Sequence, residues 1–417
     1  MSDDGSPSAD EAVAGKPTVA ILPSASLAGD AVQQQFAYGL ADELATALSP
    51  FRSFLVFVPG KHFDSGDWPG ESRVTAHRLG TRYAIEGSVH AASGRLRIIV
   101  RLVEVPSRLQ VWAERFDGAV EDMFELQDRV AAKVVAALPR RIVGAEIQRV
   151  QLLPPGKTWP YDLLLRSLAK YFTRTRGGME QAIPLLRRAV ALDPTYALAY
   201  AQLACIQWIM LPHFWATHDD PTVGDALENA RTALSLAPDD PEVSLLASTV
   251  VGTRGADVDG AIAAADRSLA LCPNQAATLR MQGVYRAFAG DVGAAYASLA
   301  QADRLNPADS GVCSNWAYLV GQFATGEHEA AIATSGALLL DRPYFTPAMR
   351  YRAASLGLVG RVEEGRQVVQ RLQDLAPAFS VARVRRNAES DMNNAIKIPG
   401  VAAAFYEGLR RVGVPEG

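Results

Sequence analysis

The sequence predicts an α+β N-terminal domain, a mixed sheet with helices, followed by an all-α array of helical hairpins. The hairpins are indicated by short strings such as LDPTY and LAPDD, which recur in the second half of the chain, each with a central proline. Successive prolines are 44, 35, 34, 36 and 34 residues apart, so one structural unit is repeated. The N-terminal domain is indicated by strand and helix patterns that alternate before residue 153. The repeat prolines are Pro194, Pro238, Pro273, Pro307, Pro343 and Pro377.

The repeated unit resembles the tetratricopeptide repeat, whose period is 34 residues. Alanine or glycine at a helix crossing lets two backbones approach to about 8 to 10 Å. Proline ends the second helix because it lacks an N–H and clashes with the preceding turn. The resemblance implies a solenoid in which each hairpin buries a face against the next one. In the unit that ends at Pro307, the small or apolar residues at the expected positions are Gly283, Ala295, Leu299 and Ala302.

The N-terminal domain, residues 17–152, begins with a short apolar strand at Thr18 to Leu22. An amphipathic helix follows, in which Phe36, Leu40, Leu44 and Leu48 recur every four residues. A second strand is expected at 53–58 and a short helix at 74–79.

The rest of this domain is predicted as a three-stranded antiparallel meander over Tyr83 to Phe116. Its middle strand, 95–105, alternates apolar residues with arginines, as a half-buried strand does. A closing helix starts near Met123, and Pro139 is expected to end or kink it.

Several strings in this domain resemble the TolB-like amino-terminal domain: TVAILPSASLAGD (18–30), FAYGLADELATAL (36–48), YAIEGSV (83–89) and WAERFD (112–117). The resemblance extends through the repeats to FYEGLRRVGVPE (405–416). It departs from the family at Ser24 and Ser26, where an aromatic residue and an asparagine are usual, and at Tyr38, where an aspartate usually precedes the glycine. In bacteria such a domain often lies between tetratricopeptide repeats and an effector, a class III adenylate cyclase or a winged-helix DNA-binding domain. That effector would precede residue 17, so the resemblance implies a sensory and interaction half without its output.

The remaining segments follow from composition. Residues 1–16 are rich in Ser, Asp, Gly and Ala and are expected to be a disordered tail. Residues 153–160 hold three prolines and a glycine, and are expected to be a linker. The solenoid of about six hairpins spans 161–379, with an insertion, LPHFWATHDD, at 211–220. Residues 380–417 are predicted to form C-terminal capping helices.

Composition and charge bear on the compartment of the protein and on its classes of partner. The formal net charge of the chain is −4, whereas nucleic-acid-binding proteins usually carry a strongly basic surface. Cys205, Cys272 and Cys313 have no metal-site or disulfide spacing, which favours a reducing compartment. The N-terminus lacks the basic start and apolar core of a secretory signal. We therefore expect a cytoplasmic protein with no membrane insertion and no nucleic-acid partner; its oligomeric state stays open.

Catalytic motifs are not found. The sequence has no glycine-rich phosphate loop with lysine, no GxGxxG and no GxSxG, and His328-Glu329 is followed by Ile332 where a zinc-protease HExxH motif needs histidine. We predict that the chain is not an enzyme and needs no cofactor.

The insertion holds the only cluster of metal-ligand types, His213, His218, Asp219 and Asp220. It is either a divalent metal site or a solvated loop in which Asp219 or Asp220 caps the next helix. The spacing fits no structural zinc pattern, so we favour the loop and predict no metal. The neighbouring Phe214 and Trp215 are expected to pack over the second hairpin rather than on a ligand.

The candidate partner-binding residues follow from the repeat resemblance. In this family the fifth and sixth positions of each first helix point into a concave groove. Arginine there offers paired donors to a carboxylate, and amides can bind an extended peptide. Solvation, or contact with neighbours inside the chain, is the alternative. The seven candidates are Gln202, Trp208, Arg280, Asn315, Tyr318, Arg350 and Tyr351.

In the N-terminal domain, Glu86, Arg97 and Arg101 line either a small-molecule pocket or, as we favour, the solvent face of the sheet. The leading hypothesis is a non-enzymatic regulatory or scaffold protein whose repeats bind a protein or peptide partner. The alternative, from the resemblance alone, is a remnant or in-trans subunit of an adenylate cyclase system. A DNA-binding regulator is disfavoured by the net negative charge.

Overall fold

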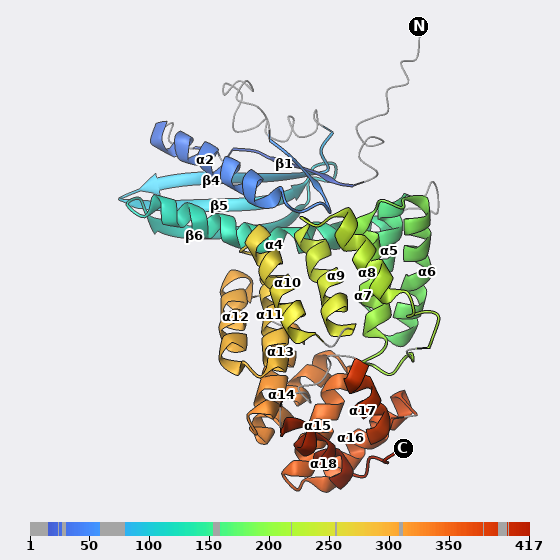
Figure 1. The fold of residues 1–417 in the computed structure, drawn as a ribbon. Coiled ribbons are helices and arrows are strands. Elements are labelled where there is room, and N and C mark those ends of the chain that lie inside the picture. The colour runs from blue at the N-terminus through green and yellow to red at the C-terminus, as the bar shows by residue number, and fades with distance from the viewer. Residues whose placement is uncertain are drawn as a thin grey trace. The chain divides into compact units, whose positions relative to one another are not determined.

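The computed structural model describes residues 16–23, 25–26, 31–58, 80–152, 159–217, 219–254, 257–307, 312–377, 379–390, 398 and 400–417. Within them the chain is mostly helical, with a small mixed sheet near the N-terminus (Figure 1). It divides into two compact units, Met1–Leu165 (unit 1) and Arg166–Gly417 (unit 2). The expected helix at 74–79, residues 1–15 of the expected tail and most of the expected linker lie outside the described residues.

Unit 1 is built on a mixed sheet, in which strand β1 runs parallel to β3 and β4 while β4, β5 and β6 are antiparallel. The order is β3-β1-β4-β5-β6, and β2 pairs with β4 in parallel beyond the end of β1. The predicted three-stranded meander is therefore confirmed. The strands described are β1 (Thr18–Ile21), β2 (Ala25–Ser26), β3 (Leu55–Phe57), β4 (Tyr83–Ala92), β5 (Arg95–Glu104) and β6 (Gln110–Ala119).

Alternation along β5 gives the sheet one buried face. Leu96, Ile98 and Val100 are buried, whereas the alternating Arg95 and Arg97 are exposed. Helix α2 (Ala31–Leu48) packs on strands β1 to β4 and on helix α4 (Met123–Leu152), and α4 packs on β6. Figure 1 shows α2 lying along the sheet.

Helix α4 does not end at Pro139, which is one of the two outcomes that the sequence indicated; the other, a kink there, stays a prediction. It continues to Leu152, and Pro139 is buried beside Leu138 and Ile142. A proline inside a helix costs about 3 kcal/mol or more. The apolar face that α4 buries offsets this cost, so tertiary packing decides the helix length.

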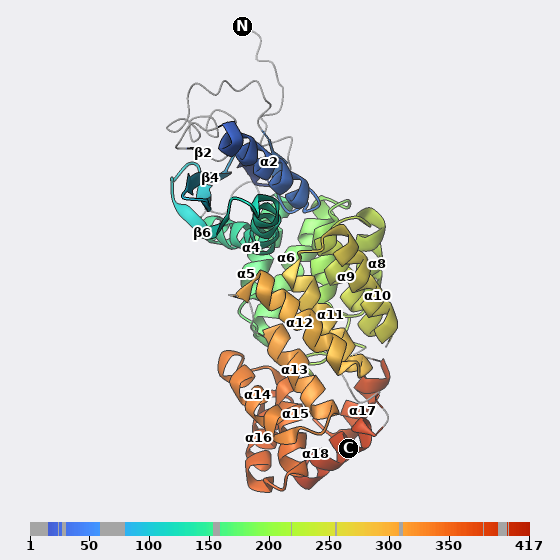
Figure 2. The ribbon, with the colours of Figure 1, turned by 90° about the vertical axis from the view of Figure 1, so that its left-hand side faces the viewer.

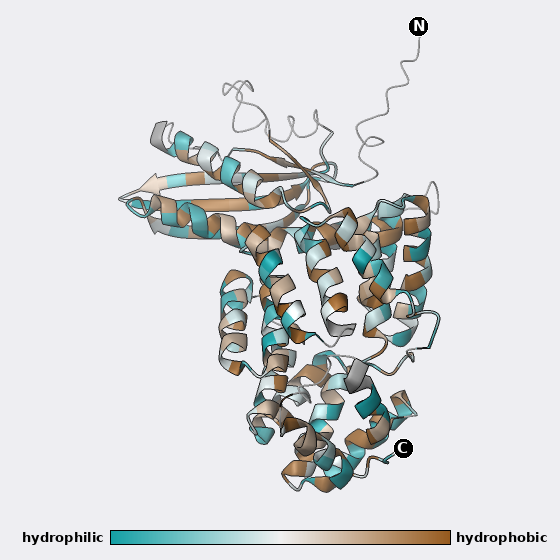
Figure 3. Cartoon of the chain, viewed as in Figure 1, coloured by the Kyte–Doolittle hydropathy of each residue, from teal (hydrophilic) through white to brown (hydrophobic). Residues whose placement is uncertain are grey.

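Unit 2 is a succession of helices in which each helix from α6 to α15 packs on the next one along the chain. First helices also contact each other: α7 with α9, α11 with α13 and α13 with α15. Figure 2 shows this order, and Figure 3 shows that hydrophobic and hydrophilic residues are interspersed along the helices. The helices are α5 (Pro160–Tyr171, which crosses the boundary between the units), α6 (Arg176–Leu192), α7 (Ala197–Ile209), α8 (Ala226–Leu236), α9 (Pro241–Arg254), α10 (Val258–Leu271), α11 (Ala276–Ala289), α12 (Val292–Leu305), α13 (Val312–Ala324), α14 (His328–Asp341), α15 (Thr346–Leu358), α16 (Val362–Leu375), α17 (Val381–Ser390) and α18 (Val401–Arg411).

The repeat prolines end the second helices, as predicted. Each of α6, α8, α10, α12, α14 and α16 ends two residues before its proline. The residue between, such as Cys272 (φ −142°, ψ 85°), has left the helical conformation, because proline excludes that conformation from the residue before it. Its N–H still donates to the carbonyl four residues back, Ser268 for Cys272. One residue type therefore sets the length of every second helix.

Small residues set the helix crossings. A Cβ on Gly283 of α11 would lie 2.9 Å from Leu299 Cδ2 of α12, so the predicted close crossing is confirmed. The crossing of α15 and α18 is closer still: a Cβ on Gly357 would overlap the carbonyl oxygen of Gly408, and a Cβ on Gly408 would overlap that of Ala354. Helix α18 therefore lies directly on the backbone of α15.

We predict that Gly357→Ala lowers the free energy of unfolding by about 1–3 kcal/mol or more, because the new methyl group forces α18 away from α15. Gly293→Ala is the control, since Gly293 is an exposed helical residue with open space around its Cα. It should be neutral or stabilising by up to about 1 kcal/mol. Urea denaturation followed by circular dichroism measures both, and equal stability of the two variants would contradict the close crossing.

Candidate functional site

The seven predicted groove residues divide into two sets. Gln202, Arg280, Arg350 and Tyr351 are at most 5% exposed. The other three, Trp208, Asn315 and Tyr318, are half-buried. The first set is therefore buried within the chain, and a partner-binding role for these four residues stays a prediction.

Arg280 of α11 serves the end of the neighbouring helix. Its Nη2 donates to the carbonyl oxygen of Asn306 (2.7 Å), just past the C-terminus of α12, and lies 3.3 Å from the Asp303 carboxylate. A cation stabilises a helix C-terminus, where carbonyl groups lack partners within the helix. Arg280 thus holds α11 to α12.

Arg350 of α15 binds the insertion. Its Nη2 donates to the carbonyl oxygen of Pro212 (3.2 Å), 138 residues earlier in the chain, and its guanidinium lies 5.1 Å from the centre of the Phe214 ring. This contact was not expected, because the insertion was predicted to stay with its own hairpin. Arg350 instead connects the loop after α7 to the last repeat.

The insertion is buried where it was expected to be partly solvated. Residues 210–216 are all buried. The ring of Phe214 meets Phe379 edge-on at 5.6 Å, and the Arg383 guanidinium lies 5.1 Å from its centre. The expectation that Phe214 packs over the second hairpin is wrong, because these neighbours come from the C-terminal part of unit 2.

His213 is held as a neutral side chain. Its Nδ1 donates to the carbonyl oxygen of Ile209 (2.9 Å), and its ring contacts Trp215 and Phe345, with centroids 4.4 and 5.4 Å away. Burial first, and then the cations Arg350 and Arg174, lower the pKa of His213 to about 3, although the bond to Ile209 opposes this. His213 is therefore uncharged at neutral pH.

Asp220, another metal-type residue of the insertion, has hydrogen-bond partners of its own. Asp220 accepts hydrogen bonds from the N–H (2.8 Å) and hydroxyl (2.6 Å) of Thr222, which lowers the pKa of Asp220. It caps a turn rather than a helix, since α8 begins only at Ala226. His218 lies outside the described residues, and no group of three metal-type side chains occurs in the part of the chain that the structure covers.

Tyr351 belongs to an aromatic cluster in the core of unit 2. Its ring lies 5.3 Å from Trp316, 5.2 Å from Phe323 and 5.0 Å from Phe405 of α18. Edge-to-face pairs of this kind stabilise a core by about 0.5–1.5 kcal/mol each beyond area burial. Tyr351 thus joins α13, α15 and α18.

Three predicted groove residues still reach solvent. Tyr318 of α13 packs on Tyr296 of α12, with ring centroids 4.8 Å apart. Trp208 of α7 is half-buried, and its indole N–H has no hydrogen-bond partner among the described residues. A partner-binding role for these two and for Asn315 stays a prediction.

In unit 1, the members of the predicted trio, Glu86, Arg97 and Arg101, differ in exposure. Arg97 forms an ion pair (2.7 Å) with Asp117 on β6, which lowers the pKa of Asp117, and more than half of the Arg97 side chain is exposed. Arg97 therefore has the solvent-facing position that we favoured. Glu86 is 9% exposed and lies opposite Arg101 in the β4–β5 register, so the solvent-face interpretation is wrong for Glu86.

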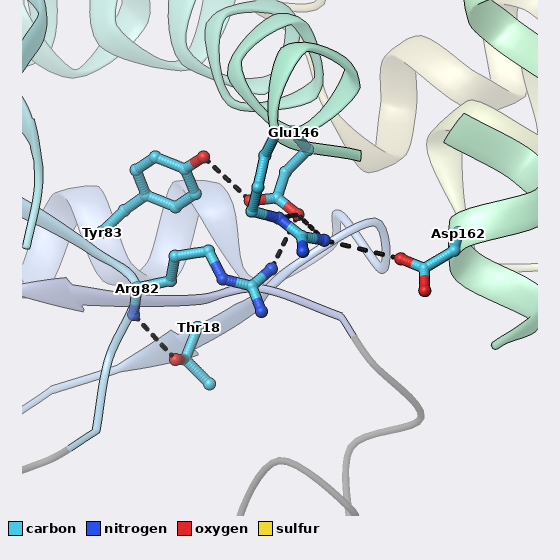
Figure 4. Close-up of polar contacts among 6 residues, drawn as sticks. Thr18, Arg82, Tyr83, Glu146 and Asp162 are labelled. Atoms are coloured by element: carbon cyan, nitrogen blue, oxygen red, sulfur yellow. Dashed lines mark hydrogen bonds and ion pairs between the residues drawn. The ribbon is translucent and has the colours of Figure 1, made fainter. Parts of the chain in front are cut away.

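The strongest polar cluster of unit 1 was not predicted. The fully buried Glu146 of α4 accepts hydrogen bonds from Arg82 Nη1 (2.7 Å), the Tyr83 hydroxyl (2.9 Å) and Arg149 Nη2 (2.9 Å), as Figure 4 shows. Arg149 Nη2 also lies 3.5 Å from Asp162 in the first turn of α5. The cluster therefore joins the start of β4, α4 and α5.

The electrostatics of this cluster are those of a structural junction. Burial first, and then the Glu146 carboxylate, raise the pKa of Tyr83, so its hydroxyl stays protonated and donates. The backbone N–H of Arg82 also donates to Thr18 Oγ1 of β1 (3.2 Å). The sequence carried one signal of this site: Glu146 interrupts the apolar spacing of Ile142 and Val150 on α4.

Comparison with known proteins gives two similarities. No family model matches the chain. The curated protein Putative adenylate cyclase 3 from Rhizobium meliloti (strain 1021) is 32% identical over 231 residues, which are 54% of this chain and 39% of that protein. This chain thus spans about two fifths of the relative's length. A solved tetratricopeptide repeat protein from Parabacteroides merdae ATCC 43184 is 14% identical, with a TM-score of 0.33, over 61% of this chain and 98% of that one. None of the described helices has the length and apolar character needed to span a membrane.

We predict that Glu146→Ala lowers the free energy of unfolding by roughly 3–5 kcal/mol, because it leaves two partly buried arginines near each other without their buried carboxylate. Tyr83→Phe should cost less, about 1.5–3 kcal/mol, since it removes one hydrogen bond to a charged group. The control is Glu114→Gln, whose partly exposed ion pair with Lys133 should contribute at most about 1 kcal/mol. Chemical denaturation measures all three, and a Glu146→Ala variant as stable as Glu114→Gln would show that the junction is not needed.

Another prediction concerns the pH dependence of the free energy of unfolding. Because the pKa of His213 is about 3 in the folded chain and that of an unfolded histidine is about 6.5, only the unfolded chain takes up a proton as the pH falls below about 6.5. The free energy of unfolding should therefore fall by roughly 1.4 kcal/mol per pH unit between these values. His213→Gln should flatten this slope between about pH 7 and about pH 5, where few carboxylates titrate. Urea denaturation followed by tryptophan fluorescence tests it, with His90→Gln at an exposed position of β4 as the control. Equal slopes for His213→Gln and the wild type would show that His213 is not neutral and buried.

Proposed function

We propose that this chain is a non-enzymatic regulatory or scaffold protein, and that unit 2 is a tetratricopeptide-type solenoid that binds a protein partner. One observation carries the proposal: the sequence period equals the period of the helix pairs. The pairs α9/α10, α11/α12, α13/α14 and α15/α16 begin at residues 241, 276, 312 and 346, so each pair takes 34 to 36 residues. Each pair ends at a repeat proline.

Such a stack supports a binding role for a geometric reason. When hairpins pack in series, their first helices together form one extended face, which no single hairpin could offer. The contacts of α11 with α13 and of α13 with α15 agree with such a face. Its candidate contact residues are now the half-buried Trp208, Asn315 and Tyr318, since Arg280 and Arg350 are used inside the chain.

A second candidate is a regulatory role in an adenylate cyclase system, as a remnant or as a subunit that acts in trans. It is favoured by the 32% identity to a protein named as a putative adenylate cyclase and by the TolB-like strings in unit 1. On this proposal the catalytic domain lies on another polypeptide. Unit 1 would then sense a signal or dock, and unit 2 would hold the catalytic partner.

The test starts from affinity capture with the full chain, followed by calorimetric titration of each purified binding protein. Replacing Trp208, Asn315 and Tyr318 together by alanine should weaken binding by at least tenfold, because aromatic residues dominate interface energies, with about 2 kcal/mol or more for one such residue. Arg267→Ala is the matched control, since Arg267 is exposed on the second helix α10. The same affinity for both variants would reject this face as the binding surface.

An enzymatic assay separates the two candidates. The purified chain should not convert ATP to cyclic AMP, and on the second candidate it should change the rate of a captured cyclase chain. Cyclic AMP formation by the chain alone would contradict both.

A further inference from the structure

The loop after α7 packs against residues that lie much later in the chain. We name residues 210–216 the plug, and the side chains of Phe345, Arg350, Phe379 and Arg383 that contact it the plug site. We propose that the plug site is a binding site for a protein segment in which an aromatic residue stands next to carboxylates, and that the plug occupies it until such a segment displaces it. The inference rests on the proposed partner-binding function of unit 2.

The first argument is that the hairpin does not need the plug. Other pairs are joined by very short connections, such as Gly290 and Asp291 between α11 and α12. The α7/α8 pair instead uses residues 210–225, which explains the long step of 44 residues in the proline series. The additional chain does not stay on its own hairpin but reaches residues from Phe345 onward.

The second argument is the way in which the plug is held. Three of its residues are bound in succession: the Pro212 carbonyl by Arg350, the His213 ring against Phe345, and the Phe214 ring against Phe379. One backbone carbonyl and two side-chain rings are what a bound peptide offers to a groove. The plug therefore uses the contacts that a foreign peptide would use.

The third argument is that this conformation has a cost. Phe214 has φ 59°, in the left-handed region that side chains other than those of Gly, Asn and Asp rarely adopt. Such a residue persists only where surrounding contacts hold it there. A segment that fills the plug site without this turn would compete with the plug.

The fourth argument is charge. The Phe214 ring lies 5.1 Å from two guanidinium groups, those of Arg350 and Arg383. Burial, and then the neighbouring Arg386, lower the pKa of Arg383, so its surroundings already carry positive charge. A ring attracts a guanidinium less strongly than a carboxylate that accepts paired hydrogen bonds does. An aromatic residue flanked by Asp or Glu would thus fill the plug site and add an interaction that the plug lacks.

The experiment uses two labelled peptides and fluorescence anisotropy. One peptide has the plug sequence, MLPHFWA, and the other has glutamates on both sides of its Phe-Trp pair. We expect Phe214→Ala to bind the acidic peptide at least tenfold more tightly than the wild-type chain does, because the site is vacated. The acidic peptide should also bind this variant more tightly than the plug peptide. Adding Arg383→Ala should abolish that difference, whereas adding Arg267→Ala should not.

A measurement on the wild-type chain keeps the proposal testable if Phe214→Ala does not fold. The plug amides are protected by hydrogen bonds, from Phe214 N–H to Leu211 O and from Trp215 N–H to Met210 O, both 2.9 Å. Saturating acidic peptide should speed deuterium exchange in residues 210–216, and a peptide of the same composition in scrambled order should not. Unchanged exchange, or a folded Phe214→Ala variant without increased binding, would show that the plug is a fixed part of the core.

The results separate this inference from the proposed function. Loss of partner binding in the Trp208, Asn315 and Tyr318 variant, together with no effect of Phe214→Ala, would leave the function standing and reject the plug. Peptide binding to Phe214→Ala without any captured partner would do the reverse.

Discussion

The constraint on which unit 2 depends is the exclusion of the helical conformation from the residue before proline. Each second helix has to end at the same point of its repeat, because that residue is forced to extended backbone. The next first helix then begins after a short turn and packs on the previous pair. A regular helix length thereby becomes a regular stack. Small residues at the crossings, with Gly283 as the example, let the two helices of a pair approach closely.

Regular stacking also explains why two arginines at equivalent positions of their helix pairs, Arg280 and Arg350, bind different groups. Arg280 lies where the end of α12 presents free carbonyl groups, so its guanidinium caps that helix. Arg350 occupies the corresponding place two pairs later, where the insertion presents the Pro212 carbonyl, and binds that group instead. In both cases a buried cation finds carbonyl oxygens within the chain, as a buried charge must. In unit 1 the buried carboxylate of Glu146 likewise has charged partners within the chain, Arg82 and Arg149.

Local signals were enough to predict much of the fold. Proline spacing, the alternation along β5 and the spacing of Phe36, Leu40 and Leu44 each reflect contacts within or between neighbouring elements. The residues of the candidate functional site were harder to predict, because burial of a side chain depends on segments far away in the sequence. Nothing near Arg350 indicates that Pro212 will be its partner, and family position alone placed both arginines in an open groove. Glu146 did leave a local trace, a charge within an apolar stripe, but its partners near residue 82 are equally distant. Pro139 shows the opposite case, in which a local signal for a helix end is outweighed by the apolar face that α4 buries.

The energetics of the plug are suited to a switch. Burying a phenylalanine side chain stabilises by about 1.5–3 kcal/mol, and a residue held at positive φ costs about 1–3 kcal/mol. The Arg350 hydrogen bond and the ring contacts then add a few kcal/mol at most. A net preference of roughly 2.7 kcal/mol for the closed plug would leave about 1% of molecules open and weaken a partner's apparent affinity about a hundredfold. A closure of this size blocks weak, unspecific peptides, yet a segment with one additional charged hydrogen bond to Arg383 recovers much of the loss. The chemistry of the plug site, rather than its shape alone, would therefore decide which partner opens unit 2.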